Sequence, residues 1–110
     1  MIFDQKAFLK RMEQLYAKNV DISRRKNSDY AGGEDPFQNF RLIEFMTRGR
    51  VSVEDGLLVR MSDKMQRIGN LLDGRKPEVQ DESLLDALSD LSNYSVILRM
   101  YLELKYGRKD

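Results

Sequence analysis

The sequence contains neither cysteine nor histidine. Without cysteine there are no disulfides, no thiolate metal ligands and no cysteine nucleophile. Without histidine there is no Ser–His–Asp triad and no imidazole metal ligand. Any catalysis must therefore use carboxylates, lysine, tyrosine, hydroxyl groups or a metal ion held by oxygen atoms, and oxygen ligands favour Mg²⁺ or Mn²⁺ over Zn²⁺.

Long apolar runs and a strong net charge are also missing. No run approaches the ~20 apolar residues that a membrane-spanning helix needs, and the opening MIFDQKAFLKRM has no signal-peptide core. We therefore expect a cytoplasmic protein with no membrane partner. The net charge of +1 gives no long-range attraction to nucleic acid, so we expect no direct nucleic-acid binding.

The composition is that of a globular protein, with 41% hydrophobic and 34% charged residues. The length of 110 residues predicts a single domain that spans residues 1–110. A chain of this size buries only a small core, and we therefore expect a homo-oligomer.

Apolar residues recur at helical spacing along most of the chain, which predicts an all-α bundle of four main helices with short connections. In the third helix the apolar stripe consists of Leu57, Met61, Met65, Ile68 and Leu72. Capping residues and glycines set the expected ends. The four helices are expected from about Asp4 to the mid-twenties, from Pro36 to near Gly49, from the SVED capping box at 52–55 to about Leu72, and from about Asp81 to Tyr106.

The stretch KNSDYAGGEDPFQNF, residues 26–40, is expected to be a loop between the first two helices and has two interpretations. As a connector, its double glycine permits a turn, and its asparagine and aspartate side chains cap and turn the backbone. As a ligand-binding loop, it offers a cation, an amide, a carboxylate and a stacking ring, which are the groups that a nucleotide requires. These groups belong to Lys26, Asn27, Asp29 and Tyr30.

Acidic residues gather at the start of the fourth helix. Helical geometry stacks Asp86, Asp90 and Asn93 on one face, with Glu82 one turn earlier. Oxygen ligands on adjacent turns suit a divalent cation, so Glu82, Asp86 and Asp90 are candidate metal ligands, and Asn93 is a candidate substrate-binding residue. The alternative is a solvated helix N-terminus, where negative charge is favourable without a metal.

Charges also cluster on one face of the third helix, at Arg60, Asp63, Lys64 and Arg67. A functional interpretation gives Asp63 a metal ion and gives the three cations phosphate oxygens to bind. The alternative is a solvent-exposed face with one salt bridge between Asp63 and Arg67, four residues apart.

Three segments follow one another between Lys26 and Leu98: KNSDYAGGEDPFQNF, VRMSDKMQRIGNLL and DESLLDALSDLSNYSVIL. In this order they resemble the nucleotide modification associated domain 1 family of bacteriophages, prophages and bacteria. Its members show similar Lys-Asn-x-Asp-Tyr, Asp-Lys and Asp-Glu-Ser segments. The architecture also looks similar to the all-α nucleoside triphosphate pyrophosphohydrolases, the MazG-like and dimeric dUTPase group, which bind magnesium through carboxylates on two antiparallel helices and cleave between the α and β phosphates.

The resemblance implies a nucleotide-binding protein linked to nucleotide or DNA-base modification, with Mg²⁺ or Mn²⁺ as cofactor for triphosphate hydrolysis. Asp63, Asp86 and Asp90 would then be catalytic metal ligands, and Lys64 and Arg67 would neutralise phosphate charge. The segment Lys26–Tyr30 would hold the base or sugar or close over the phosphates. The pyrophosphohydrolases carry Glu-x-x-Glu on one helix and Glu-x-x-Asp on the next, and Asp63 has no acidic partner three residues away.

Two other hypotheses stay open beside a magnesium-dependent hydrolase. The missing acidic partner on the third helix favours a non-catalytic module that binds or sequesters a nucleotide. Six methionines and a long final helix also suit a structural helical oligomer in which the charges are simply solvated.

Overall fold

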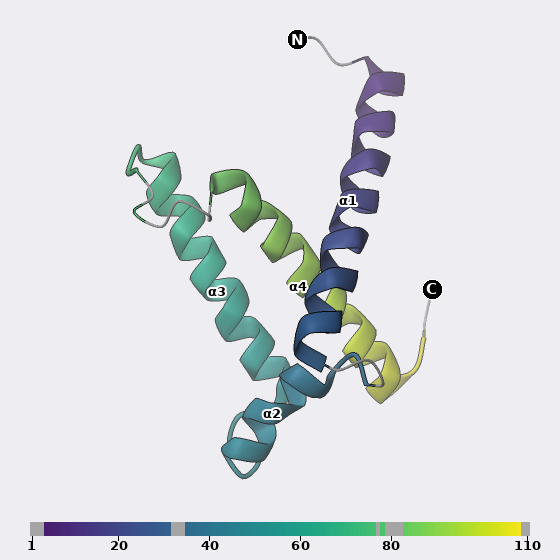
Figure 1. Ribbon diagram of the computed structural model, residues 1–110, viewed down its shortest axis with the longest axis vertical. Helices are drawn as coiled ribbons and strands as arrows, with labels where there is room; N and C mark the ends of the chain where they lie inside the picture. The colour runs from purple at the N-terminus through teal and green to yellow at the C-terminus, as the bar shows by residue number, and fades with distance from the viewer. Residues whose placement is uncertain (1–3, 32–34, 77, 79–82, 109–110) are drawn as a thin grey trace.

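The computed structural model describes residues 4–31, 35–76, 78 and 83–108, and the regular structure within those ranges is entirely helical. Four helices are present there: α1 (Gln5–Ala31), α2 (Gln38–Met46), α3 (Val53–Leu72) and α4 (Leu84–Tyr106). Helices α3 and α4 lie side by side, α2 lies at one end of this pair, and α1 crosses α4 (Figure 1). The predicted all-α bundle of four helices is confirmed.

Helix α1 is longer than the sequence predicts, because it continues to Ala31. The prediction that a loop begins at Lys26 is wrong. No glycine or proline interrupts residues 5–31, so nothing in the backbone ends the helix earlier. At its start, a carboxylate oxygen of Asp4 accepts the N–H of Ala7 at 2.8 Å and caps the first turn. Lys26 and Asn27 are therefore carried by a helix rather than by a loop.

Serine caps fix the starts of the two longest neighbouring helices. Ser52 Oγ accepts the Asp55 N–H at 3.0 Å, which confirms the predicted cap of α3. Helix α4 begins at Leu84 with a full capping box between Ser83 and Asp86. The N–H of Ser83 and its hydroxyl both donate to Asp86 Oδ2, at 3.2 and 2.9 Å. The carboxylate of Asp86 is thus occupied by the start of its own helix.

The core lies where the turn before α2 meets α3 and α4. In the described part of the chain the buried apolar side chains are Phe37, Val53, Leu57 and Ala87, and α1 contributes none of them. Phe37 packs edge-on against Tyr101 of α4, with 5.7 Å between ring centroids. This core is small for a chain of this length, so much apolar surface stays exposed.

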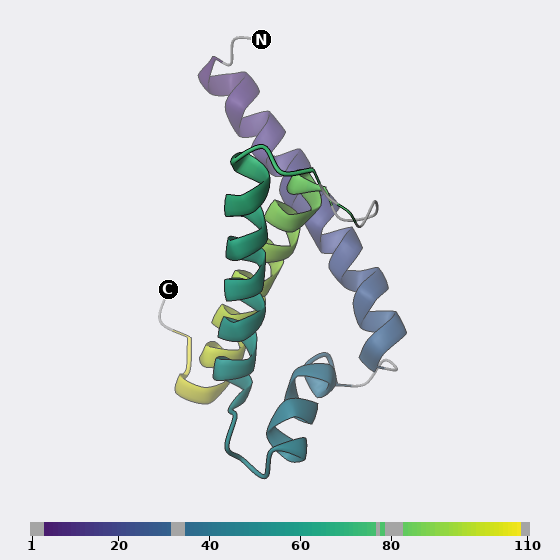
Figure 2. The ribbon, with the colours of Figure 1, turned by 90° about the vertical axis from the view of Figure 1, so that its left-hand side faces the viewer.

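Exposed apolar side chains occur on all four helices, among them Phe8 of α1, Phe45 of α2, Leu72 of α3 and Leu85 of α4. The N-terminal half of α1 projects beyond the other helices in both views (Figures 1 and 2). No helix within the described ranges has the length and apolar character that crossing a bilayer would require.

Candidate functional site

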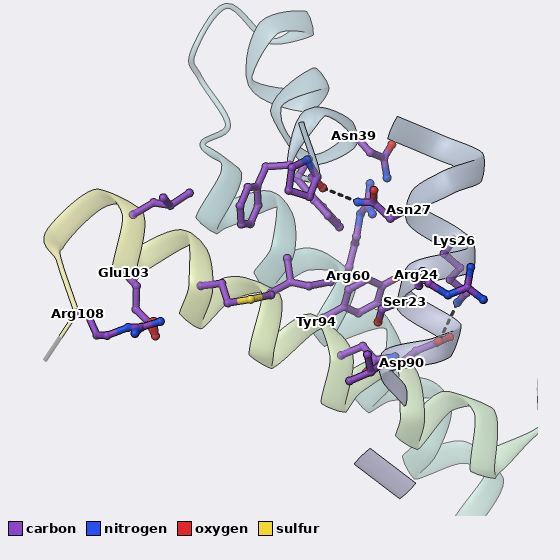
Figure 3. Close-up of a pocket in the computed structure, with 18 residues that line it drawn as sticks. Ser23, Arg24, Lys26, Asn27, Asn39, Arg60, Asp90, Tyr94, Glu103 and Arg108 are labelled. Carbon is purple, nitrogen blue, oxygen red and sulfur yellow. Dashed lines mark hydrogen bonds and ion pairs between the residues drawn. The ribbon is translucent and has the colours of Figure 1, made fainter. Parts of the chain in front are cut away.

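A cavity of about 790 Å³ lies between the C-terminal half of α1, the start of α2 and one face of α4 (Figure 3). Its volume falls within the range of roughly 300–1,000 Å³ typical of small-molecule sites. The Asn27 amide donates to the Pro36 carbonyl oxygen at 3.0 Å and ties α1 to the turn that precedes α2. The same turn is closed by Asp35, whose carboxylate accepts the Phe37 N–H at 3.0 Å. These two bonds fix the turn that carries Pro36 and Phe37, which are both part of the cavity lining.

Five residues that the sequence singles out line this cavity, and they come from three helices. They are Lys26 and Asn27 of α1, Arg60 of α3, and Asp90 and Asn93 of α4. Asp90 and Asn93 share a face of α4, as helical spacing predicts. The fold therefore joins parts of the predicted loop, third helix and fourth helix in one site.

Asp90 is held by two lysines from two different helices. Lys26 Nζ lies 3.0 Å from one carboxylate oxygen, and Lys64 Nζ lies 3.1 Å from the other. The side chains of Asp90 and Lys64 are only 17% and 18% exposed, so water screens this pair less than an ordinary surface ion pair. One carboxylate thus fastens α1 and α3 to α4 at this end of the cavity.

The guanidinium of Arg60 lies among aromatic rings. Its Cζ is 4.8 Å from the ring centre of Phe40 and 6.0 Å from that of Tyr94. Stacking fixes the plane of the guanidinium but uses none of its N–H donors. Within the part of the chain that the structure describes, Arg60 forms no ion pair, so its donors are available to a ligand.

The cavity has an apolar middle and charged ends. Phe37, Ile97 and Met100 line the middle. Glu103 and Arg108 lie at the end opposite Lys26 and Asp90, as Figure 3 shows. The lining includes four cationic side chains (Arg24, Lys26, Arg60 and Arg108) against two acidic ones (Asp90 and Glu103). Lys26 pairs with Asp90, Arg108 with Glu103, and Arg24 with Asp21 outside the lining, so Arg60 is the lining cation most open to a ligand that carries negative charge.

The other predicted site residues do not line the cavity. Lys64 contacts it indirectly, through its ion pair with Asp90. Asp29 and Asp63 are exposed, and Arg67 is half-buried on α3. Asp86 forms the capping box, and the hydrogen bond from the Ser83 hydroxyl is the largest cause that lowers the pKa of Asp86 from its ordinary value of 3.8. The Tyr30 side chain and Glu82 lie outside the described residues.

The carboxylates predicted to hold magnesium do not gather among the described residues. Nowhere in that part of the chain are three acidic side chains placed to hold a metal ion. Both oxygens of Asp90 face lysines, and Asp86 is bonded to Ser83. Among the described residues the two carboxylates are therefore engaged by lysines and by a serine, and the nucleotide binding proposed below does not depend on a metal.

Comparison with known proteins gives no guide to the ligand. No family model, no curated protein and no solved structure matches this chain. The chemistry of the lining side chains is therefore the basis for naming a ligand.

Sequence reasoning missed the aromatic part of the site. Phe37 and Phe40 fall within the expected second helix and Tyr94 within the expected fourth, where helical spacing places them in apolar stripes. Their position beside Arg60 depends on how three helices pack, which no local spacing reveals. The one available signal was the pair of phenylalanines that ends the KNSDYAGGEDPFQNF segment.

Proposed function

We propose that this chain is a nucleotide-binding protein and that the nucleotide occupies the cavity between α1, α2 and α4. The observation that carries the proposal is the meeting of aromatic rings, a stacked arginine and further cationic side chains in one cavity of about 790 Å³. A nucleotide is a ligand with both an aromatic ring and several negative charges. The resemblance to a nucleotide modification family points to the same class of ligand.

The aromatic part of the cavity supplies the base-binding surface. Phe40, Tyr94 and the guanidinium of Arg60 present flat faces within one group. Stacking of a base on such faces contributes about 1–3 kcal/mol per base and tolerates different bases. Asn27 and Asn93, both in the lining, add amide groups for the polar edge of a base or for the sugar.

The cations supply the phosphate-binding surface. Arg60 offers planar paired donors, and Lys26 offers a point charge beside Asp90. Phosphate oxygens placed there would compete with Asp90 for Lys26 and Lys64, which now lie 3.0 and 3.1 Å from its carboxylate. Asp90 therefore keeps the lysines in place before the ligand arrives.

Magnesium-dependent hydrolysis of a nucleoside triphosphate, linked to phage nucleotide or DNA-base modification, stays a prediction from the resemblance. It is the second candidate function because Asp90 faces the same cavity as the phosphate-binding cations. A metal ion would have to take the Asp90 oxygens from the two lysines. The homo-oligomer that the sequence predicts also stays a proposal.

Titration of nucleoside triphosphates into the protein, with and without Mg²⁺, tests the proposal. We expect a nucleoside triphosphate to raise the melting temperature, because a ligand that binds only the folded state stabilises it. The nucleoside alone and inorganic triphosphate alone should each bind more weakly, since each uses only one part of the cavity. A folded protein that no nucleotide stabilises would contradict the proposal.

Arg60→Gln should weaken binding of the triphosphate by about tenfold or more, which corresponds to about 1.4 kcal/mol. The matched control is Arg75→Gln, because Arg75 is exposed in the loop after α3 and lies outside the cavity. Equal losses of triphosphate affinity in the two variants would show that binding depends only on the overall charge of the protein. Calorimetric titration of both variants provides the measurement.

Asp90→Asn separates binding from hydrolysis. If the site only binds, the variant should bind triphosphate more tightly in Mg²⁺-free buffer, because the competing carboxylate is gone. If Asp90 holds a catalytic metal, the wild-type protein should release monophosphate or pyrophosphate with Mg²⁺ and the variant should not. Product analysis by chromatography distinguishes the two functions.

A further inference from the structure

Helix α3 has one side without charge. Arg60 and Lys64 lie on the side that faces α4, where they contact Tyr94 and Asp90. At 100° per residue the opposite side carries no charged residue between Asp55 and Asp73, in a chain of which 34% is charged. We call this side the outer face of α3; it consists of Leu58, Val59, Ser62, Met65, Gln66, Gly69 and Leu72.

The outer face is open to solvent. Leu58, Met65 and Leu72 are 52%, 61% and 69% exposed, and they repeat every seven residues along the helix. Figure 2 shows α3 in front, with no other described helix lying across it. The spacing of seven is the spacing at which one helix packs along another. This apolar stripe therefore has the spacing of a helix-packing surface, but no described helix covers it.

Knobs and holes occur together on the outer face. Met65 and Leu72 are exposed and border a shallow hollow whose lining also includes Ser62, Gly69 and Asp73. A Cβ added to Gly69 would meet nothing within 4 Å, so packing within the chain does not require glycine at this position. Glycine in a helix interior costs about 1 kcal/mol relative to alanine. Close approach of another backbone would explain its presence.

We propose that the outer face of α3 binds the same face of a second copy of this chain. A twofold contact requires a surface that is complementary to itself. The outer face meets this condition along its middle, where projecting side chains lie next to a hollow, and the charged residues Asp55 and Asp73 lie at its two ends. It lies on the side of α3 away from Arg60, so the contact leaves the nucleotide cavity free, and the proposal does not depend on nucleotide binding.

The projecting half of α1 is a second exposed apolar surface. Phe8 and Met12 are 50% and 40% exposed. At 100° per residue, Lys10, Arg11 and Lys18 lie outside the stripe that carries Phe8 and Met12, so the hollow at Gly69, and not charge, distinguishes the outer face of α3.

The exposed apolar area sets the strength of the contact. With Leu58, Val59, Met65 and Leu72 between 52% and 69% exposed, the outer face leaves on the order of 400 Å² of apolar surface open, within the range of roughly 300–600 Å² for the largest patch on a monomer. A twofold contact would bury about twice this area plus its rim, roughly 1,000 Å², which is at the lower limit of specific interfaces. We therefore expect a dimer that forms reversibly as the protein concentration rises.

Sedimentation velocity on the full chain, without nucleotide, from about 1 µM to about 1 mM, tests this inference over the range of weak to moderate affinity. The wild-type protein should shift from monomer to dimer across the series. Met65→Glu places a charge at the centre of the contact and should raise the dissociation constant by at least about tenfold. The control is Leu85→Glu, which changes an exposed residue in the first turn of α4 and should leave the dissociation constant unchanged.

Circular dichroism confirms that each variant is folded, and Leu72→Glu replaces Met65→Glu if the latter loses its helical signal. Two results would overturn the inference: a wild-type protein that stays monomeric over the whole series, or a dimer that both glutamate variants of the outer face leave intact. A dimer that Leu85→Glu breaks instead would assign the contact to α4 and would also contradict the proposal.

Discussion

In part of α3, the distribution of charged and apolar residues is the reverse of that in an ordinary surface helix. Such a helix turns its apolar residues inward and its charged residues outward. In α3 the charged Lys64 is only 18% exposed beside α4, while Met65, its neighbour in sequence, is 61% exposed on the outer face. The charged side faces a cavity that suits an anionic ligand, and the apolar side has no cover within the described chain.

This difference teaches that amphipathicity alone does not orient a helix. Val53 and Leu57 are completely buried and hold the inner side of α3 against its neighbours. Arg60 and Lys64 follow on the same helix. The guanidinium of Arg60 lies over the Phe40 ring, and Lys64 pairs with the carboxylate of Asp90. The remaining apolar stripe then points away from α4. Each prediction below compares a residue on one side of α3 with a residue on the other or beyond it.

Leu57 and Leu58 are consecutive residues about 100° apart around the helix, with exposures of 0% and 52%. Leu57→Ala should lower the free energy of unfolding by about 2–5 kcal/mol, because it removes buried methyl groups and leaves a cavity. Leu58→Ala should change it by less than about 1 kcal/mol in dilute solution, where the chain is monomeric. Urea unfolding at low protein concentration gives both values.

Similar losses for the two leucines would contradict the orientation of α3. A loss for Leu58→Ala that appears only at high protein concentration would instead support the dimer, because a contact between copies stabilises the folded state by mass action.

The sequence predicted the helices well because helical periodicity and caps are local. Ser52 of the SVED segment caps α3 by accepting the Asp55 N–H, as predicted, whereas the full capping box with both bonds is given for Ser83 and Asp86 of α4. The glycines predicted to end the third and fourth helices, Gly74 and Gly107, have positive φ angles of 91° and 89°. Periodicity could not show what covers an apolar stripe. Met65 belongs to the apolar stripe predicted for the third helix, and it is exposed.

The site was only partly predictable, because its residues find their partners across helices. Asp86 and Asp90 have equivalent spacing on one helix face, and the sequence assigned both to a metal. The S-x-x-D pattern at residues 83–86 was a local signal that Asp86 would cap α4. No local signal indicates that Asp90 pairs with Lys26 and Lys64, because these residues lie 64 and 26 positions away.

Gly56 and Gly69 differ in how closely other atoms of the chain surround them on α3. A Cβ on Gly69 would meet no atom within 4 Å, whereas a Cβ on Gly56 would lie 3.0 Å from Ile43 Cγ2 of α2. Gly69→Ala should therefore stabilise the monomer by about 0.5–1 kcal/mol through helix propensity. Gly56→Ala should gain less or lose stability, because Ile43 must move. Thermal unfolding in dilute solution ranks the two variants, and the reverse order would contradict the packing of α2 on α3.

The smallest expected effect is the pH dependence of stability that arises from the ion pair between Glu54, in the first turn of α3, and Lys105 of α4. Lys105 Nζ of α4 donates to Glu54 Oε2 at 2.8 Å, and this bond is the largest cause that lowers the pKa of Glu54 from its ordinary 4.5 and raises that of Lys105 from 10.5. A lowered carboxyl pKa adds stability above the ordinary value and loses it as the pH falls through the folded-state value. A raised lysine pKa adds stability below about 10.5 and loses it as the pH rises further.

Glu54→Gln should therefore be less stable than the wild-type protein between about pH 5 and pH 10, and the two proteins should converge in acid. The difference is expected to be small, because Lys105 is nearly half exposed and water screens the pair. Melting temperatures of both proteins across this pH range measure it, and Glu78→Gln in the loop before α4 is the control. A constant difference that persists below the folded-state pKa would mean that Glu54 acts through packing instead of charge.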